Sequence, residues 1–487
     1  MINKTILICI VATTMTVLSC KIEKPEAAIR QQKPNIIFIL ADDLGYGDLS
    51  MTGQEKFNTP NIDQLAADGM FFTQHYSGST VCAPSRASLM TGLHTGHAPV
   101  RGNKEVQPEG QEPLISPEQT LPELLQSAGY VTGAFGKWGL GYPGSKGDPG
   151  NLGFDTFYGY NCQRMGHNYY PHHLWDNNKK ILLDENKGQA TGDYGPELIH
   201  QQALDFIDTH KDSSFFMFYP SIIPHAELIA PDEYMEKYIG KYQPETNYVG
   251  VNDQYETLEN SLIQKTGGYS PQENPRAAFA AMVHILDEQL GDIRGKVEQL
   301  GIADNTLIIF TSDNGAHEEG GADPKYFNSN ADLRGYKRDL YEGGIRVPMI
   351  AYWPDHISAG INNKHISAFW DILPTFCDIA GIEIPNKIDG ISFYPSLTGK
   401  SQKEHDHLYW EFHEQGARQA VRMGPWKGVR LDMGNNPDTP IELYNLDNDI
   451  SENNNIAADN PQIINTIDSI MKAEHVMSDV FRFRYEQ

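Results

Sequence analysis

Cysteine is scarce in this chain of 487 residues. The five cysteines stand at positions 9, 20, 82, 162 and 377, and the first two fall within the N-terminal 20 residues. Three irregularly spaced cysteines in the remainder are too few for a disulfide framework or for a zinc site built from thiolates. Hydrophobic residues make up 39% of the chain, enough for one large core with an appendage. Stability therefore has to come from buried apolar side chains.

Basic residues are also under-represented. The chain has 38 Lys and Arg against 64 Asp and Glu, a formal net charge of −26. This excess of acid argues against a nucleic-acid partner and against general electrostatic attraction of an anionic substrate. A binding site for an anion must therefore be a local basic pocket.

Long hydrophobic length is lacking in the N-terminal apolar run, which is too short to span a membrane as a mature helix. The apolar run Ile6 to Leu18 ends in Val-Leu-Ser-Cys, the pattern of an export signal that resembles the lipobox of bacterial lipoproteins. We expect a lipoprotein signal peptide over 1–19 and a polar tether over 20–33, with Cys20 lipidated as the only membrane anchor. The alternative is an ordinary signal peptide cut near Ala27-Ala28. Either predicts export, to the periplasm or outer membrane of a Gram-negative bacterium.

Short β-type runs alternate with helical stretches, which predicts an α/β domain with a largely parallel sheet. Four runs end at or shortly before polar residues: Asn35–Ala41 before Asp42-Asp43, Val131–Phe135 before Gly136-Lys137, Phe215–Tyr219 before Pro224-His225, and Thr306–Thr311 before Asp313-Asn314. The carboxyl ends of strands flank the ligand crevice of open α/β sheets, so we expect these groups around one site. The alternative for each is a turn or a helix cap.

Four of these polar residues suggest a metal site. Asp42, Asp43, Asp313 and Asn314 offer only hard oxygen ligands, which suit calcium or magnesium and not zinc or copper. Adjacent carboxylates repel one another unless a cation lies between them. We expect one Ca²⁺ ion, because a mixed carboxylate and amide set fits its loose coordination.

The segment Ser79–Gly92 places Cys82 at the start of a predicted helix, with Pro84 early in it and Gly92 at its end. Alone, this position predicts either a thiolate of low pKa or a small buried apolar residue. The string Cys-x-Pro-Ser-Arg with its Leu-Met-Thr-Gly ending, however, resembles the signature of type I, formylglycine-dependent sulfatases. Four further blocks resemble that family in the same order along the chain: Asp42–Asp48, Gly136–Trp138, Ser312–Gly315 and Tyr341–Pro348.

The resemblance runs from about Pro34 to Gly399 and implies an alkaline-phosphatase-like central mixed sheet flanked by helices. It implies a sulfatase catalytic domain over 34–400 and a smaller C-terminal antiparallel-sheet subdomain over 401–487. The residues themselves predict four short strands there, at 407–412, 418–423, 426–431 and 441–446, followed by a helix over 461–473.

The resemblance also implies residue roles. Cys82 would be oxidised to formylglycine by a formylglycine-generating or anaerobic sulfatase-maturating enzyme and then hydrated, so that one hydroxyl attacks sulfur and the other expels sulfate. Arg86 would stabilise the diol, while Lys137, His225 and Lys337 would contact sulfate oxygens. The four oxygen-ligand residues would hold the metal. His225 is also a candidate general acid, the alternative being a surface turn histidine.

One departure from the family pattern stands out. Many members carry a histidine where this chain has Gly139, and we consider His94, His97 and His317 as replacements, with His317 preferred because it lies three residues after Asn314.

Tyr170–Trp175 and the His317-Glu318 pair resemble bacterial carbohydrate sulfatases of the arylsulfatase A and N-acetylgalactosamine-6-sulfatase kind, so we expect a galactose or N-acetylgalactosamine sulfate, at O4 or O6. Aromatic rings stack on sugars and polar side chains pair with hydroxyls, although aromatic residues more often fill the core. The expected substrate contacts are His172, His173, Trp175, Glu318 and His413. Two alternatives remain: a formylglycine-dependent phosphonate or phosphate ester hydrolase, and a non-catalytic sugar-binding lipoprotein.

Overall fold

The strand β1 (Asn35–Ala41) lies in the middle of the main sheet, between the two hydrophobic cores of the fold. It is buried along its whole length and pairs in parallel with β12 (Thr306–Ser312) on one side and β9 (Phe215–Pro220) on the other. Successive side chains of a strand point to opposite faces, so Ile37 enters one hydrophobic core and Phe38 the other. Because both faces are covered, the strand is apolar throughout instead of alternating.

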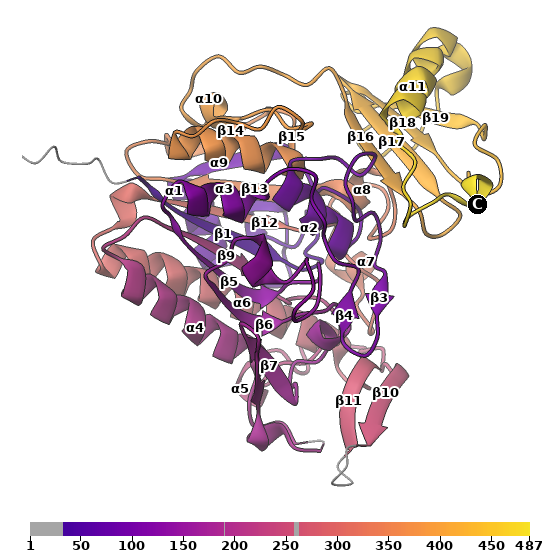
Figure 1. Cartoon of the computed structure of the whole chain (residues 1–487). Coiled ribbons are helices and arrows are strands. Elements are labelled where there is room, and N and C mark those ends of the chain that lie inside the picture. Colours follow the sequence, from indigo (N-terminus) through magenta and orange to yellow (C-terminus); the bar gives the residue numbers. More distant parts are fainter. Residues whose placement is uncertain (1–32, 189, 258–262) are drawn as a thin grey trace, which may run out of the picture. The chain divides into compact units, whose positions relative to one another are not determined.

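The computed structural model describes residues 33–188, 190–257 and 263–487 (Figure 1). The predicted signal peptide, Cys20 and the tether up to residue 32 lie outside this part of the chain. Residues 33–487 form one compact unit. Within the described ranges, no helix combines the length and the apolar character needed to cross a membrane.

The main sheet is mixed, and its central strands are parallel. In spatial order it contains β14 (Ile361–Asn363), β2 (Met70–Tyr76), β13 (Arg346–Tyr352), β12, β1, β9, β5 (Val131–Lys137), β6 (Thr156–Tyr160), β7 (His173–Asp176) and β8 (Lys179–Leu182), while β15 (Ser367–Ala368) also pairs with β2. The β13 strand runs antiparallel to its neighbours, as does β7. The predicted α/β fold with a mixed central sheet is confirmed.

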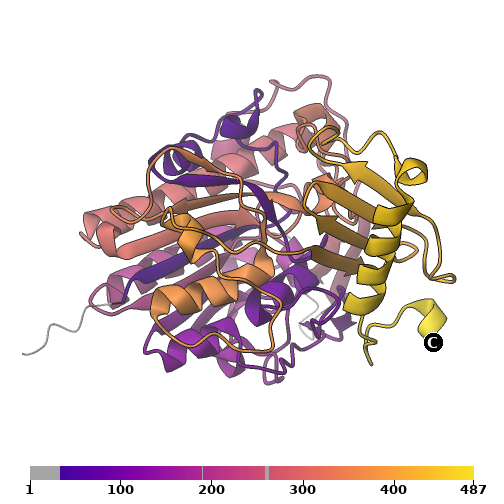
Figure 2. The same ribbon diagram turned by 90° about the horizontal axis from the view of Figure 1, so that it is seen from above.

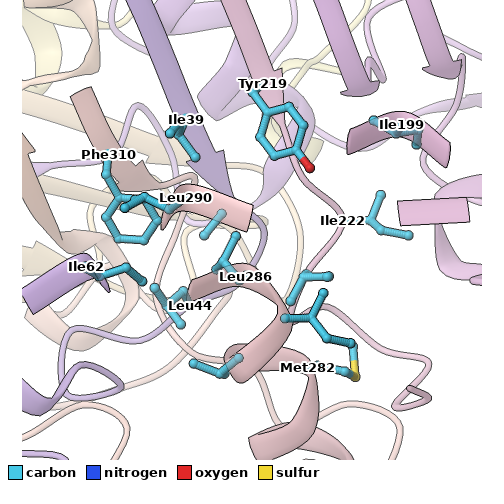
Figure 3. Packing of buried hydrophobic residues seen from close by; sticks show 14 of the residues in the cluster. Ile39, Leu44, Ile62, Ile199, Tyr219, Ile222, Met282, Leu286, Leu290 and Phe310 are labelled. Atoms are coloured by element: carbon cyan, nitrogen blue, oxygen red, sulfur yellow. The ribbon is translucent and has the colours of Figure 1, made fainter. Parts of the chain in front are cut away.

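Helices cover both faces of this sheet (Figure 1). One core contains residues of α1 (Pro60–Asp68), α4 (Gly195–His210) and α6 (Pro275–Gln299). Figure 3 shows Leu286 and Leu290 of α6 in this core together with Ile39 of β1 and Phe310 of β12. The opposite core contains residues of α2 (Cys82–Thr91), α3 (Leu121–Ser127), α9 (Ile372–Ala380) and α10 (Tyr394–Leu397).

The remaining α-helices and strands lie outside the main sheet and the C-terminal sheet. They are the helices α5 (Asp232–Met235), α7 (Pro324–Phe327) and α8 (Glu342–Ile345), and the two-stranded sheets β3 (Glu105–Val106) with β4 (Gly110–Gln111) and β10 (Val251–Thr257) with β11 (Ile263–Tyr269).

The C-terminal part forms its own antiparallel sheet, as predicted. Its strands are β16 (Leu408–Phe412), β17 (Arg418–Met423), β18 (Trp426–Arg430) and β19 (Ile441–Asn445), and α11 (Pro461–Glu474) follows them. Each boundary lies within one residue of its predicted position. Figure 2 shows α11 lying across the strands, where Ile467 and Met471 pack against Tyr409 and Val421.

A buried ion pair ties this sheet to the rest of the chain. Nζ of Lys427 in β18 lies 2.8 Å from Oε1 of Glu342 at the start of α8, and both side chains are fully buried. Burial opposes the charge of Glu342, but Lys427, Arg422 and Arg346 hold the pKa of this carboxyl at about 2. The Glu342 carboxyl is therefore ionised, and its buried charge depends on these cations.

We expect Lys427→Met to lower the free energy of unfolding by about 3–5 kcal/mol, because it leaves the Glu342 carboxylate buried with its nearest cation removed. Urea denaturation followed by intrinsic fluorescence measures this. The control is Lys387→Met, which removes a lysine that is 84% exposed and lies 3.7 Å from Glu118. That change should alter stability by less than about 1 kcal/mol. Equal effects of the two substitutions would contradict this account.

Candidate active site

The four predicted segments meet at one edge of the main sheet. Because β12, β1, β9 and β5 are neighbours in the sheet, their carboxyl ends lie side by side. Asp42 follows β1 directly, Asp313 follows β12, Lys137 is the last residue of β5, and His225 lies shortly after β9. All four side chains are at most 2% exposed. Four unrelated turns or helix caps would not bring these buried side chains to one place, so the shared-site prediction explains them better than that alternative does.

Cys82 is the first residue of α2 and faces this edge. Its Sγ lies 3.3 Å from Oδ1 of Asp42 and 3.6 Å from Nζ of Lys137. Burial, together with the charges of Asp313 and Asp42, raises the pKa of the Cys82 thiol well above its usual range. Burial and the two carboxylates thus outweigh Lys137 and Lys337, so the surroundings favour the neutral thiol over the thiolate.

Arg86 lies one helical turn after Cys82 and therefore on the same face of α2. Its guanidinium contacts Oδ2 of Asp313 through Nη2 at 2.9 Å and through Nε at 3.2 Å, and its Nη1 donates to the carbonyl of Lys137. Nη2 also lies 3.6 Å from Oδ2 of Asp42. The arginine thus joins the ends of three strands to the helix that carries Cys82.

The carboxylates and the amide predicted to hold a metal lie together. The backbone N–H of Asp43 donates to Oδ1 of Asp313 at 3.1 Å, and Nδ2 of Asn314 donates to Oδ1 of Asp43 at 2.7 Å. Burial and the charge of Asp42 raise the pKa of Asp313 to about 7. Oδ1 of Asn314 is buried and accepts no hydrogen bond from any residue that the structure describes. Crowded carboxylates with an unpaired amide oxygen fit a hard divalent cation.

Lys337 lies at the other side of this group. Its Nζ contacts Oδ2 of Asp43 at 2.8 Å, Nε2 of His225 at 3.0 Å and Oε2 of Glu319 at 3.0 Å. Burial lowers the pKa of Lys337, but Asp43 and Glu319 outweigh this and raise it well above its usual range. Two buried lysines and one arginine thus lie in this group, each paired with a carboxylate, and they are the local cations that an anion site in an acidic chain requires.

His225 lies in a stack of three imidazoles. Its ring centroid is 4.6 Å from that of His167 and 5.6 Å from that of His317, and the planes are within 12° of parallel. Burial, followed by the charges of Lys337 and Lys137, lowers the pKa of His225 well below its usual range. His225 is therefore a neutral imidazole whose ring orientation is set on both sides.

Two residues of this group escaped the sequence analysis. His167 follows no recognisable strand end, and only the tertiary structure brings it to His225. Glu319 lies beside Glu318, which we had singled out, but Glu318 is exposed and lies 3.8 Å from Lys325. Glu319 instead contacts Lys337 and Arg338. No pattern in the sequence distinguishes the two glutamates.

The space beside Gly139 is occupied by another side chain. A Cβ at this position would lie 2.1 Å from Nε2 of Gln163, and the backbone has φ of +76°. His317 reaches the site through its stacking on His225, whereas His94 and His97 contact Asp389 and Glu474. Neither of these two imidazoles fills the position beside Gly139.

The remaining expected substrate residues make other contacts. Nε2 of His173 lies 2.9 Å from Glu109, and the Nε1–H of Trp175 donates to the same carboxylate at 2.7 Å. His172 is half-buried next to them. His413 contacts Glu411 at 2.9 Å and stacks on Phe483. None of these residues has a recorded contact with Cys82 or its neighbours in the part of the chain that the structure describes.

We expect Gly139→Ala to lower the thermal unfolding midpoint and the activity more than Gly144→Ala does. Gly144 has a similar φ of +80° but no atom within 4 Å of an added Cβ, so this control isolates the backbone strain. The extra loss at position 139 comes from displacing Gln163. Calorimetry and rate measurements on both variants test this, and equal losses would contradict it.

Comparison with known proteins finds sulfatases, in agreement with the signature around Cys82. A family model described as Sulfatase matches residues 34–382, and one described as N-sulphoglucosamine sulphohydrolase, C-terminal, matches residues 335–477. N-acetylgalactosamine-6-sulfatase of Mus musculus is 31% identical over 425 residues, covering 82% of this chain and 72% of that protein. Arylsulfatase G of Rattus norvegicus is 30% identical over 489 residues, covering 93% and 88%.

A solved structure is similar to this chain in fold. The crystal structure of Ps i-CgsB has a TM-score of 0.74 at 28% identity and covers 93% of this chain and 95% of that chain. The same protein has been solved in complex with k-i-k-neocarrahexaose, with a TM-score of 0.73 at 28% identity, covering 91% of this chain and 94% of that chain.

Proposed function

Because this chain belongs to the sulfatase family and is therefore a sulfuric ester hydrolase, we propose that it removes an O-sulfate group from a galactose or N-acetylgalactosamine unit of a glycan, at O4 or O6. The observation that carries this proposal is the position of Cys82, which lies at a helix start within 3.3 Å of Asp42 and 3.6 Å of Lys137. Similarity to N-acetylgalactosamine-6-sulfatases and to a protein solved with k-i-k-neocarrahexaose supports the sugar class.

The proposed nucleophile is formylglycine made from Cys82 by a maturating enzyme, and its hydrate would supply a hydroxyl to attack sulfur. Arg86 lies one turn further along α2, in reach of that group. Lys137 and Lys337 are the buried cations available for sulfate oxygens. His225 is neutral, so a proton that it gives to the leaving oxygen would first have to come from the Lys337 ammonium, whose Nζ lies 3.0 Å from its Nε2. His317 keeps the His225 ring in place.

We further propose that Asp42, Asp43, Asp313 and Asn314 hold one Ca²⁺ ion. Their oxygens are the ligands that calcium prefers. Burial and then the charge of Asp42 raise the pKa of Asp313, and a divalent charge would offset both effects. Bound there, the ion would polarise a sulfate oxygen and stabilise negative charge.

The substrate subsites and cellular location are proposals of the same kind. We propose that sugar units beyond the sulfate are contacted by His172, His173, Trp175, Glu318 and His413. We also propose a catalytic domain over 34–400 and a subdomain over 401–487. Lipidation at Cys20 after removal of 1–19, with 20–33 as a tether, would place the enzyme at a membrane of the bacterial envelope.

The test is hydrolysis of a panel of position-defined sulfated monosaccharides by protein with Cys82 converted. We expect release of sulfate from a galactose or N-acetylgalactosamine sulfate, and a loss of at least about 1,000-fold in kcat/KM in Cys82→Ala. A phosphonate monoester serves as the comparison substrate. Turnover of that ester without any sulfate release would favour the phosphonate hydrolase, and cleavage of only glucosamine or uronate sulfates would overturn the sugar assignment.

Removal of the metal tests whether sulfate release depends on a bound calcium ion. We expect chelation to abolish sulfate release and added Ca²⁺ to restore it. Asp313→Asn should lower the calcium affinity by at least about tenfold, measured by elemental analysis after equilibrium dialysis. Cys82→Ala is the matched control, because it should bind calcium like the wild type while remaining inactive. Undiminished sulfate release in the presence of chelator would contradict the calcium proposal.

A further inference from the structure

A second cluster of imidazoles and carboxylates lies apart from the Cys82 group, where three segments meet. His94 and His97 follow α2, Asp389 lies between α9 and α10, and Glu474 is the last residue of α11. One ligand atom from each of His94, His97 and Glu474 lies within 4.8 Å of the others. Nothing in the proposed sulfatase chemistry uses these residues.

The spacing of these atoms fits a metal ion. Nε2 of His94 lies 3.1 Å from Oε2 of Glu474, and Nε2 of His97 lies 3.9 Å from the same oxygen. Tetrahedral ligands bound at 2.0–2.2 Å are about 3.3 Å apart. The rings of His94 and His97 stack, with centroids 4.3 Å apart and planes 30° apart, so the His94 ring would have to turn on binding to bring both Nε2 lone pairs onto one ion.

The neighbouring groups hold these ligands in position. Nδ1 of His97 lies 2.9 Å from Oδ1 of Asp389, which leaves its Nε2, 3.9 Å from Oε2 of Glu474, as the nitrogen available for a metal ion. Metal-binding histidines are usually fixed by a carboxylate in this way. The backbone N–H of His94 donates to Oδ2 of Asp389 at 2.9 Å, and His407 contacts the other oxygen of Glu474 at 3.1 Å.

The backbone at this junction is tightly packed, yet the cluster is accessible. A Cβ at Gly96 would lie 2.2 Å from the carbonyl oxygen of Glu474, so only glycine allows the end of α11 to approach this closely. A cavity of about 240 Å³ lined by His94, Asp389, His407 and Glu474 adjoins the cluster. An ion can therefore enter from solvent, and water can complete its coordination.

We propose that His94, His97 and Glu474 bind a divalent transition-metal ion of the Zn²⁺ type, which fastens the end of α11 to the segment after α2. Two imidazoles and one carboxylate are ligands that zinc accepts and that calcium does not favour. One contact must change on binding: the N–H of Gly96 donates to Nδ1 of His94 at 3.1 Å, and metal on Nε2 would put a proton on Nδ1. The competing account is that the histidine–carboxylate contacts alone hold the segments together.

The experiment titrates the whole chain with Zn²⁺ after chelation and saturation with Ca²⁺, which occupies the oxygen-ligand site. Elemental analysis and calorimetry should find one zinc ion per chain. His97→Gln should lower the zinc affinity by at least about 100-fold, the upper end of the loss seen when a supporting contact is removed. His356→Gln, at an exposed histidine, is the control and should bind zinc like the wild type.

A second measurement distinguishes loss of zinc binding from misfolding of the variant. Zinc should raise the thermal unfolding midpoint of the wild type and of His356→Gln but not of His97→Gln, whose side chain is 29% exposed and so tolerates replacement. Co²⁺ bound to the wild type should give visible absorption that Glu474→Gln alters. Absence of zinc binding by the wild type, or equal binding by His97→Gln, would overturn the proposal. None of these measurements uses a sulfate ester, so failure of the proposed function would leave them unaffected.

Discussion

Charge balance among fully buried groups governs the structure at the carboxyl edge of the main sheet. The carboxylates of Asp42, Asp43 and Asp313 face the cations of Arg86, Lys137 and Lys337, and each cation contacts at least one carboxylate. An unpaired charge at this depth would be very unfavourable, so removal of any member exposes its partner to the full desolvation penalty. The group holds together only because β12, β1, β9 and β5 are adjacent and α2 begins beside their carboxyl ends.

Much of the fold was predictable because its strands are buried and bounded by residues that end them. The runs that became β1, β9 and β12, and the four C-terminal strands, have continuous or alternating apolar patterns. The predicted run at Val131 ended two residues early, since β5 continues through Gly136 to Lys137. Pairing of Gly136 with Gly159 of β6 maintains the strand where the apolar pattern stops.

The candidate site was predictable where residues follow strands and not where loops supply them. Asp42, Asp313 and Lys137 could be placed together because parallel strands deliver their ends to one edge. His167 and Gln163 come from the loop after β6, and their positions depend on how that loop packs against His225 and Gly139. Glu319, likewise, is distinguished from its neighbour only by the direction in which each side chain leaves an irregular segment.

The most direct test of the central claim relates activity to the modification of Cys82. Preparations made with different amounts of maturating enzyme would contain different fractions of formylglycine, quantified by mass spectrometry of the peptide that includes residue 82. The account predicts that the rate of sulfate release rises in proportion to the converted fraction and extrapolates to zero for unmodified protein. A rate independent of that fraction would contradict the assignment of Cys82 as the source of the nucleophile.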